Sequence, residues 1–341
     1  MSDTNKDKYS AKYPLDEFVH EVNDNAWIIG EAMISRHNAK PSQPYWEDGE
    51  GAFFTMTKAP EPKPDTRPLS DSCPITDYLK GLSYGGFYVY KIGQAHLKVT
   101  FDTGAQEHNT LEAVAKESFG FQVPTVYCHA VYDEYYYIAH SILPGKTIAE
   151  VWPTTKDDAV RKKWTEQIAE AYVRLSEWTS DREPTDNSIR GIDGGNLKDR
   201  WPAKTNWRFR SSTDPEVLQK NFMEMGLNCS EIVFAHNHLM PLSFVVDETH
   251  GLVGITMWSA AGFVPKDWVL TKAQANPFNQ AFKAISHTWS QSDKDDWELK
   301  LLPALKAKGF ENHWYKYAVW NAPDSRERLM PATNSLNLGQ R

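Results

Sequence analysis

Residues 236–262 read HNHLMPLSFVVDETHGLVGITMWSAAG, and this stretch decides the fold. Its apolar runs at 244–247 and 252–255 are separated by the turn-forming residues 248–251, which predicts a β-hairpin. Asp247 stands where the first run ends, so we expect it to be a turn residue. The loop that leads into the hairpin carries two histidines and a serine, which makes it a candidate site.

The same stretch resembles the aminoglycoside-phosphotransferase and choline-kinase-like family. In that family H-G-D-x-x-x-x-N is followed by a hairpin and by a strand ending in I-D-W-x-x-A-G. His236 matches the motif histidine, and Asn237 replaces the glycine. His238 stands at the position of the catalytic aspartate, while Ser243 and Met257 stand at those of the metal-binding asparagine and aspartate. Three further residues match the family: Trp258, Ala261 and Gly262.

These substitutions remove the chemistry that the resemblance implies. In such kinases an aspartate accepts the proton of the substrate hydroxyl, and Mg²⁺ held by oxygen ligands neutralises the phosphates. Met257 offers a soft thioether, Ser243 a neutral hydroxyl, and His238 a nitrogen that suits zinc or copper better than magnesium. Because nothing replaces the lost negative charge, we expect no metal site, no cofactor and no ordinary ATP-dependent transfer.

The resemblance also implies the architecture, and it covers roughly residues 80–310. We expect an α+β fold of the bilobal protein-kinase-like type, with a small antiparallel-sheet N-lobe and a mainly helical C-lobe. Residues 144–153 and 193–195 resemble the fungal-type branch of the family. The expected organisation is a disordered tail at 1–12, an N-terminal extension at 13–79, the N-lobe at 80–143, the C-lobe at 144–322 and a polar tail at 323–341.

Local patterns predict the elements of both lobes. Alternation of apolar and polar residues over 85–93 and 96–101 predicts a hairpin, and a continuous apolar stripe over 159–178 predicts an amphipathic helix. The remaining predicted elements are strands at 125–131 and 135–143, helices at 105–117 and 214–226, and helices separated by loops between 265 and 308.

The extension is expected to contain a helix near 15–22 and an irregular segment over 36–72, which is rich in Pro, Gly, Asp and Glu. That segment carries aromatic residues expected to be exposed: Tyr45, Trp46, Phe53 and Phe54. Two interpretations stay open. The segment is either a docking site for a protein partner or a lid that packs on its own N-lobe.

Further kinase elements can be located by the same resemblance. Lys98 lies in a strand at the position of the phosphate-binding lysine, and Glu107 matches the glutamate that pairs with it. The pair is either a remnant of the nucleotide site or a structural salt bridge. Residues 81–86 form a glycine-rich turn that resembles a phosphate-covering loop. Asp193, in an Asp-Gly-Gly stretch, is a remaining carboxylate expected near the cleft.

Composition excludes several classes of partner. The chain has 341 residues, 40% of them hydrophobic, so a sizeable core is possible. A net charge of −8 and the lack of a basic stripe argue against nucleic acid and anionic membranes. The three cysteines show no disulfide or metal spacing, no apolar stretch is long enough to span a membrane, and the first residues are polar. We expect a soluble cytoplasmic protein.

Our first functional hypothesis is an enzyme that no longer uses ATP. The motif region has exchanged charged ligands for a mostly apolar lining, which suits a hydrophobic small-molecule substrate. The expected pocket residues, besides Asp193, Lys98 and Glu107, are Met240, Leu242, Met257 and Trp258. We expect cyclisation, isomerisation or pericyclic closure of the Diels–Alder type in secondary metabolism, by orientation of one conformer and hydrogen bonds from His238, His236 or Ser243.

Two alternatives remain open at this point. One is a non-catalytic pseudokinase that binds a ligand or a protein partner. The other is an ATP-dependent small-molecule phosphotransferase with rearranged metal ligands, for which Asp193 and Asp247 are the remaining carboxylates. A hydrolase is not expected, because no carboxylate in the sequence is placed to orient a histidine next to Ser243.

Overall fold

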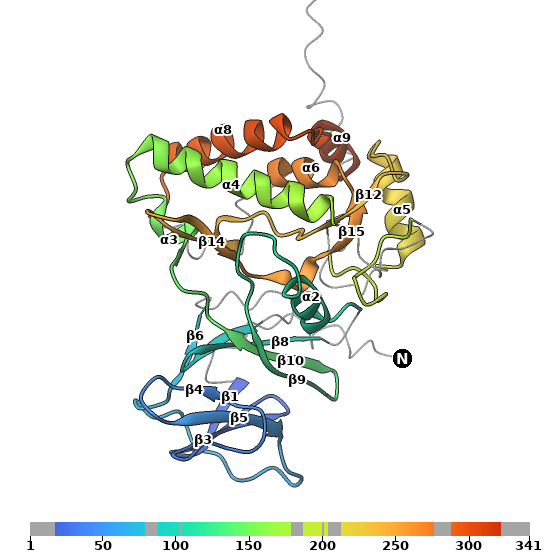
Figure 1. Cartoon of the computed structure of the whole chain (residues 1–341). Helices are drawn as coiled ribbons and strands as arrows, with labels where there is room; N and C mark the ends of the chain where they lie inside the picture. Colours follow the sequence, from blue (N-terminus) through green and yellow to red (C-terminus); the bar gives the residue numbers. More distant parts are fainter. Residues whose placement is uncertain are drawn as a thin grey trace, which may run out of the picture.

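A computed structural model describes most of the chain and shows two parts (Figure 1). Antiparallel sheets form the N-terminal part and helices dominate the C-terminal part, so the predicted α+β class with a bilobal kinase-like layout is confirmed. The described residues are 18–78, 88–101, 104–178, 187–199, 201–203, 213–275 and 288–321. The predicted tails at 1–12 and 323–341 and the glycine-rich turn at 81–86 lie outside them.

The N-lobe is a five-stranded antiparallel sheet with the order β6-β7-β8-β10-β9, and helix α2 connects β8 to β9. The predicted hairpin, helix and two further strands are therefore confirmed. Their bounds are β6 Ile75–Asp77, β7 Tyr88–Ile92, β8 Ala95–Phe101, α2 Glu107–Val114, β9 Val126–Tyr132 and β10 Tyr135–Ser141. In this register Lys98 lies opposite Ile138, and His96 lies opposite His140.

The extension forms a sheet of its own, with the order β1-β2-β3-β5-β4. The predicted helix near 15–22 is wrong from residue 19 on, and the predicted irregular segment over 36–72 is wrong in part. The strands are β1 Val19–Asn23, β2 Ala26–Ile29, β3 Ala32–His37, β4 Trp46–Glu47 and β5 Phe53–Lys58. The physical reason is a period of two: Val19 and Glu21 are buried while His20 between them is exposed.

Two aromatic residues that were predicted to be exposed are buried. Trp46 and Phe54 stack with ring centroids 5.9 Å apart, and Trp27 lies 6.4 Å from Phe54. The indole Nε1 of Trp46 donates a hydrogen bond to the carbonyl of Ile92 in the N-lobe sheet at 2.9 Å. These side chains are covered because the extension packs on the N-lobe.

The two sheets share one hydrophobic core. It combines extension residues with the outward face of the N-lobe strands: Val19, Trp27, Ile29, Ala32, Ile34, Trp46, Phe54, Ile75, Tyr90, Ile92, Ala95, Leu97, Val99, Tyr137 and Ala139. Tyr137 crosses between the sheets, since its hydroxyl accepts from the amide of Glu31 at 2.9 Å and donates to the carbonyl of Ile29 at 3.2 Å. The lid interpretation of the extension therefore agrees with its packing better than the docking interpretation.

The C-lobe is built around helix α4, which begins after Asp157. The Asp157 carboxylate accepts from the amides of Ala159 and Val160, so it caps the helix. The buried residues of α4 face α8 and the motif strands, so the predicted amphipathic helix is confirmed. The helices are α3 Ile148–Val151, α4 Asp158–Ser176, α5 Pro215–Glu224, α6 Trp268–Ala275, α8 Gln291–Ala307 and α9 Trp314–Asn321.

The motif residues lie between two small sheets of the C-lobe. Strand β12 pairs with β15, and β13 pairs with β14 as the predicted hairpin. The motif contains two short 3-10 turns, one at Pro241–Ser243 and one at Trp258–Ala260. The strands are β11 Lys146–Thr147, β12 Ile232–Ala235, β13 Phe244–Asp247, β14 Gly251–Ile255 and β15 Gly262–Pro265.

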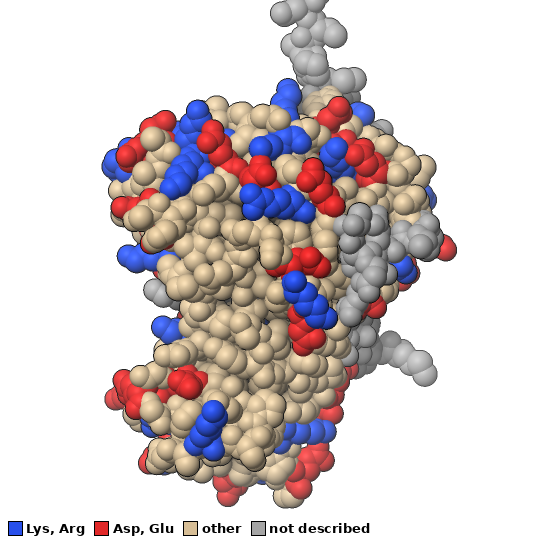
Figure 2. All heavy atoms as spheres, in the orientation of Figure 1, with Lys and Arg blue, Asp and Glu red and all other residues tan. Residues whose placement is uncertain are grey.

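The surface gives no sign of a basic stripe on the face shown in Figure 2. Lysine and arginine alternate with acidic residues over the helical lobe and the extension, while the surface between them is largely uncharged. None of the helices among the described residues combines the length and the apolar character needed to cross a bilayer.

Candidate functional site

His236 is held between the strands that frame the motif loop. Its Nε2 lies 2.7 Å from the carbonyl oxygen of Thr256, and its Nδ1 lies 3.1 Å from the hydroxyl of Tyr172. A carbonyl only accepts, so Nε2 carries the proton and Nδ1 accepts from Tyr172. The ring is fully buried, and burial lowers the pKa of His236 to about 3. This neutral imidazole joins three segments of the lobe.

His238 and Ser243 contact each other directly. The Nδ1 atom of His238 and the Oγ atom of Ser243 are 2.7 Å apart, and Ser243 is fully buried. Burial is the main reason that the pKa of His238 lies well below its ordinary value. His238 and Ser243 therefore form an uncharged, hydrogen-bonded pair.

Two residues of the motif adopt the left-handed backbone conformation. Asn237 has φ 59°, and Met257 has φ 67° and ψ 52°. Asparagine tolerates this region, whereas methionine is uncommon there, with a cost on the order of 1–3 kcal/mol. The chain therefore bends sharply at residue 257, directly before the 3-10 turn at Trp258–Ala260.

Lys98 and Glu107 form a buried ion pair beneath the N-lobe sheet. The Nζ atom of Lys98 lies 2.7 and 2.6 Å from the two carboxylate oxygens of Glu107, and both side chains are almost wholly buried. Glu107 also accepts from the backbone amide of Trp258 at 2.8 Å. Burial alone would raise the pKa of Glu107, but the charge and hydrogen bonds of Lys98 lower it. The pair thus joins the N-lobe to the segment that follows Met257.

Two histidines beside Lys98 were not predicted from the sequence as site residues. His96 and His140 are paired across β8 and β10 with ring centroids 5.8 Å apart, and Tyr78 packs on His96 at 4.1 Å. Burial lowers the pKa of both histidines, in the case of His96 to about 3. The spacing of two between residues 96 and 98 was the available signal, because it places both side chains on one face.

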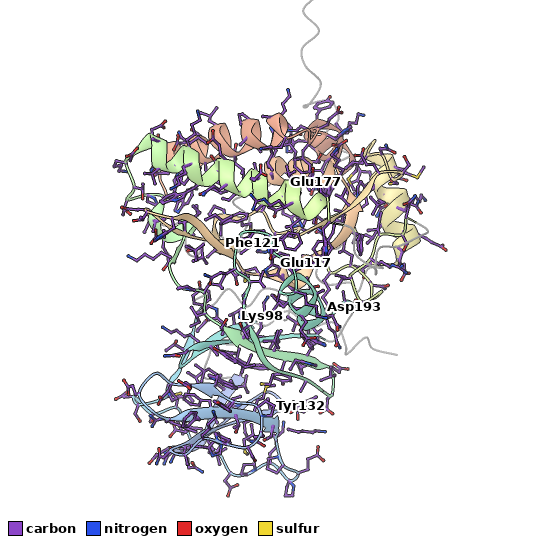
Figure 3. The ribbon with its side chains drawn as sticks, in the orientation of Figure 1. Lys98, Glu117, Phe121, Tyr132, Glu177 and Asp193 are labelled. Carbon is purple, nitrogen blue, oxygen red and sulfur yellow. The ribbon has the colours of Figure 1, made fainter. Side chains whose placement is uncertain are left out.

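Asp193 lies on the exposed side of α2 (Figure 3). Its carboxylate accepts from the amide of Gln106 at 2.9 Å and from Nδ2 of Asn109 at 3.0 Å. The loop approaches closely because a Cβ on Gly195 would lie 2.8 Å from the amide nitrogen of Ala105. Asp193 therefore caps α2, the helix that carries Glu107.

Three of the four apolar residues expected to line the pocket are buried. Trp258 donates from its indole to the carbonyl of Ile255 at 2.8 Å, and its ring meets that of His236 edge-on at 4.6 Å. Leu242 and Trp258 belong to the main core of the C-lobe, and Met240 is 6% exposed. Met257 alone among the four is partly exposed.

A lysine from α6 supports the motif loop from behind. The Nζ atom of Lys272 lies 2.7 Å from the carboxylate of Asp199 and donates to the carbonyl of Asn237. Burial lowers the pKa of Lys272, and the Asp199 carboxylate opposes this shift without cancelling it. Nothing in the sequence indicates this contact, because residues 237 and 272 are brought together only by the packing of α6.

The motif residues do not fit a magnesium ion. Mg²⁺ needs several oxygen ligands in near-octahedral array, and carboxylates usually supply them. The hydroxyl of Ser243 is hydrogen-bonded to His238, and the side chain of Met257 has no oxygen. Asp247 lies in the hairpin turn, where its Oδ1 accepts from the amides of Thr249 and His250. No step through a bound magnesium ion follows from this geometry.

Comparison with known proteins gives one family. A model described as "APH: Phosphotransferase enzyme family" matches residues 78–255. Among solved structures, an aminoglycoside-3'-phosphotransferase of type VIII is 16% identical, with 64% of this chain and 88% of that chain covered and a TM-score of 0.36. The gentamicin complex of APH(2")-IIa is 10% identical, with 72% and 85% covered and a TM-score of 0.37. Nothing among curated proteins matches.

Proposed function

Because this chain belongs to the phosphotransferase enzyme family, we propose that its site between the lobes is a phosphoryl-transfer site converted to act on a neutral, apolar small molecule without ATP. The observation that carries the proposal is the contact of 2.7 Å between His238 and Ser243. Two groups that should face a metal ion and a substrate hydroxyl bind each other instead.

The charges around the site support this proposal. Phosphoryl transfer depends almost wholly on positioning and on stabilisation of negative charge by metal ions and cationic side chains. Here His236 and His238 are neutral, and the ammonium group of Lys98 is matched by the Glu107 carboxylate. A triphosphate would bring about three to four negative charges to a region that offers little to offset them.

The His238–Ser243 pair nevertheless keeps one hydrogen-bond donor in either tautomer. If the hydroxyl of Ser243 donates to Nδ1, the N–H at Nε2 of the partly exposed His238 is available to a substrate. If Nδ1 donates, the remaining donor is the hydroxyl of Ser243, which is fully buried. A single donor of this kind can polarise a substrate carbonyl, and a well-placed one is worth ~10²–10³-fold in rate.

Cyclisation, isomerisation and pericyclic closure of the Diels–Alder type are the reactions that need such a site. They require one reactive conformer and little charge transfer, and orientation alone can supply on the order of 7–11 kcal/mol. The substrate would be a hydrophobic molecule with a conjugated carbonyl. The resemblance of residues 144–153 and 193–195 to the fungal-type branch supports a place in fungal secondary metabolism.

The test combines turnover and calorimetry on the purified protein. A panel of polyenes and enals with a conjugated carbonyl is incubated without ATP, and product formation is compared with that in buffer. We expect turnover with at least one compound and a ~10²–10³-fold loss in the S243A/H238F variant. H250Q is the matched control, because His250 is an exposed histidine in the same hairpin. Rates equal to buffer across the panel, or tight magnesium-dependent binding of ATP, would contradict the proposal.

A non-catalytic role is the second candidate, and one observation favours it. His236, His238, Ser243 and Lys98 are each bonded to another group of the protein, as expected where former catalytic positions have become structural. In that case a compound from the panel would bind saturably, and the S243A/H238F variant would bind it with altered affinity, while no product forms.

A further inference from the structure

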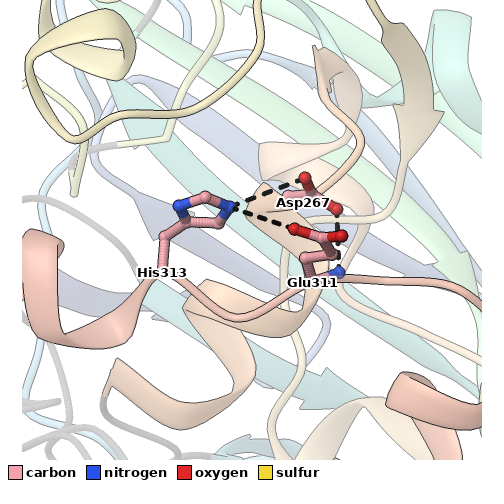
Figure 4. A group of neighbouring side chains, drawn as sticks. All are labelled: Asp267, Glu311 and His313. Atoms are coloured by element: carbon pink, nitrogen blue, oxygen red, sulfur yellow. Dashed lines mark hydrogen bonds and ion pairs between the residues drawn. The ribbon is translucent and has the colours of Figure 1, made fainter.

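Asp267, Glu311 and His313 converge at one point of the C-lobe (Figure 4). Asp267 directly precedes α6, and the other two lie in the segment between α8 and α9. The Nε2 atom of His313 lies 3.6 Å from Oδ2 of Asp267 and 3.9 Å from Oε2 of Glu311. One donor atom from each of the three side chains lies within 4.8 Å of the others.

Backbone contacts fix this arrangement. The amide of Glu311 donates to Oδ1 of Asp267 at 2.8 Å, which leaves Oδ2 directed at the imidazole. The amide of His313 donates to the hydroxyl of Thr271, in the first turn of α6, at 3.0 Å. Asp267 and His313 are mostly buried, with side chains 20% and 16% exposed, whereas Glu311 is 80% exposed. Two donors are thus held by the fold, and the third approaches from solvent.

Neither of the two distances between His313 and the carboxylates is short enough for a direct hydrogen bond. A hydrogen bond from an imidazole N–H to a carboxylate measures about 2.7–3.2 Å, and both separations exceed that range. Donors around a tetrahedral zinc ion with bonds of ~2.0–2.1 Å stand about 3.3 Å apart. A shift of a few tenths of an ångström would bring the imidazole nitrogen of His313 to that spacing from each carboxylate, and the exposed side chain of Glu311 can turn to set its separation from Asp267.

The negative charge of the two carboxylates in this cluster also favours binding of a cation. Two carboxylates face one imidazole, and within the described part of the chain neither Asp267 nor Glu311 forms an ion pair with a lysine or arginine. The neighbouring cations are used elsewhere, since Lys266 pairs with Glu231 and Lys272 with Asp199. A divalent ion would neutralise the cluster.

We propose that Asp267, Glu311 and His313 bind a divalent transition-metal ion, with zinc as the best fit and water as the fourth ligand. One imidazole nitrogen and two carboxylate oxygens suit borderline ions, whereas magnesium and calcium prefer oxygen alone. The ion ties the segment before α9 to the start of α6. The ion has a structural role: an ion that binds the folded chain and not the unfolded chain raises the free energy of unfolding.

The experiment uses the full chain freed of metal with a chelator and dialysed. Zinc is titrated by calorimetry, cobalt by its visible absorption, and the melting temperature is recorded with and without zinc. We expect one ion per chain and a higher melting temperature with zinc. Loss of one ligand in H313Q or E311Q is expected to weaken affinity by at least about 10–100-fold, as even outer-shell changes do. H250Q is the matched control, because His250 pairs with Asp247 at 3.0 Å in a histidine–carboxylate pair outside this cluster.

Three results would overturn the proposal. The first is the absence of saturable zinc binding at micromolar concentrations. The second is zinc binding by H313Q as tight as that by the wild type, and the third is a loss of zinc affinity in H250Q as large as that in H313Q. A fourth is specific to the ion-pair explanation: H313Q lowers the melting temperature by the same amount with and without zinc. Circular dichroism of each variant verifies that the fold is intact before the titrations are compared.

Discussion

Glu107 connects the two lobes through a single carboxylate. It pairs with the Lys98 ammonium and accepts from the amide of Trp258, and all of these groups are buried. A buried pair need not stabilise a protein relative to apolar residues, but removal of one partner leaves a charge without compensation. Loss of the Glu107 carboxylate is therefore expected to lower the stability of the folded chain.

We expect E107Q to lower the free energy of unfolding by about 3–5 kcal/mol, because Lys98 loses its counter-charge in a buried place. Urea denaturation measures this change. The double variant K98M/E107Q should recover most of the loss, since glutamine still accepts from the amide of Trp258. E112Q, at an exposed position of the same helix, is the control. A loss below about 1 kcal/mol in E107Q would show that water or another group solvates Lys98.

At the scale of elements, the N-lobe sheet is covered on both faces. The extension sheet packs on one face, and α2 with the Lys98–Glu107 pair lies on the other. Gly30 in the turn between β2 and β3 permits the contact, because a Cβ there would lie 2.7 Å from the hydroxyl of Tyr137. The extension is therefore part of the folding unit of the N-lobe.

The hydroxyl of Tyr137 is the polar link between these two sheets, and Y137F tests it. The variant leaves the amide of Glu31 and the carbonyl of Ile29 without their partner, so we expect a loss of ~1–3 kcal/mol in unfolding free energy. Y132F, on a neighbouring ring 5.5 Å away, should stay within about 0.5 kcal/mol of the wild type. Equal effects of the two variants would indicate that ring packing, rather than the hydroxyl, joins the sheets.

For the whole molecule, buried neutral histidines make stability depend on pH. Burial lowers the pKa of His96 and of His236 from 6.5 to about 3 in the folded chain. The unfolded chain therefore binds more protons than the folded chain below pH 6.5. Their contribution is present above that pH and is lost as the pH falls towards 3, by ~2 kcal/mol per histidine at pH 5.

Urea denaturation at pH 7 and pH 5 measures this dependence. Between pH 7 and pH 5 we expect the unfolding free energy of H96N to fall by ~2 kcal/mol less than that of the wild type, because asparagine does not titrate. H250N, which removes an exposed histidine, should keep the full dependence. If H96N and the wild type lose the same amount, His96 is protonated in the folded chain at pH 5.

The sequence predicted much of the fold for physical reasons that can be stated. Apolar residues at helical spacing over 159–178 and alternation over 96–101 do not depend on distant contacts, and both elements form as expected. The pattern of the extension was not recognised because its strands are short and the loops between them are rich in Pro and Gly. The burial of Trp46 and Phe54 comes from the N-lobe sheet, which is more distant in the chain.

The candidate site, like the fold, could be predicted from the sequence only in part. That positions 238, 243 and 257 carry no carboxylate follows from the identities of His238, Ser243 and Met257. The sequence alone determined this, because the chemical type of a side chain is a property of the residue. Only the tertiary structure decided that His238 bonds to Ser243, that Asp193 caps α2 and that Lys272 supports the motif loop. The physical reason is that a hydrogen bond needs two atoms at a fixed distance, and that distance is set by how the strands and helices pack.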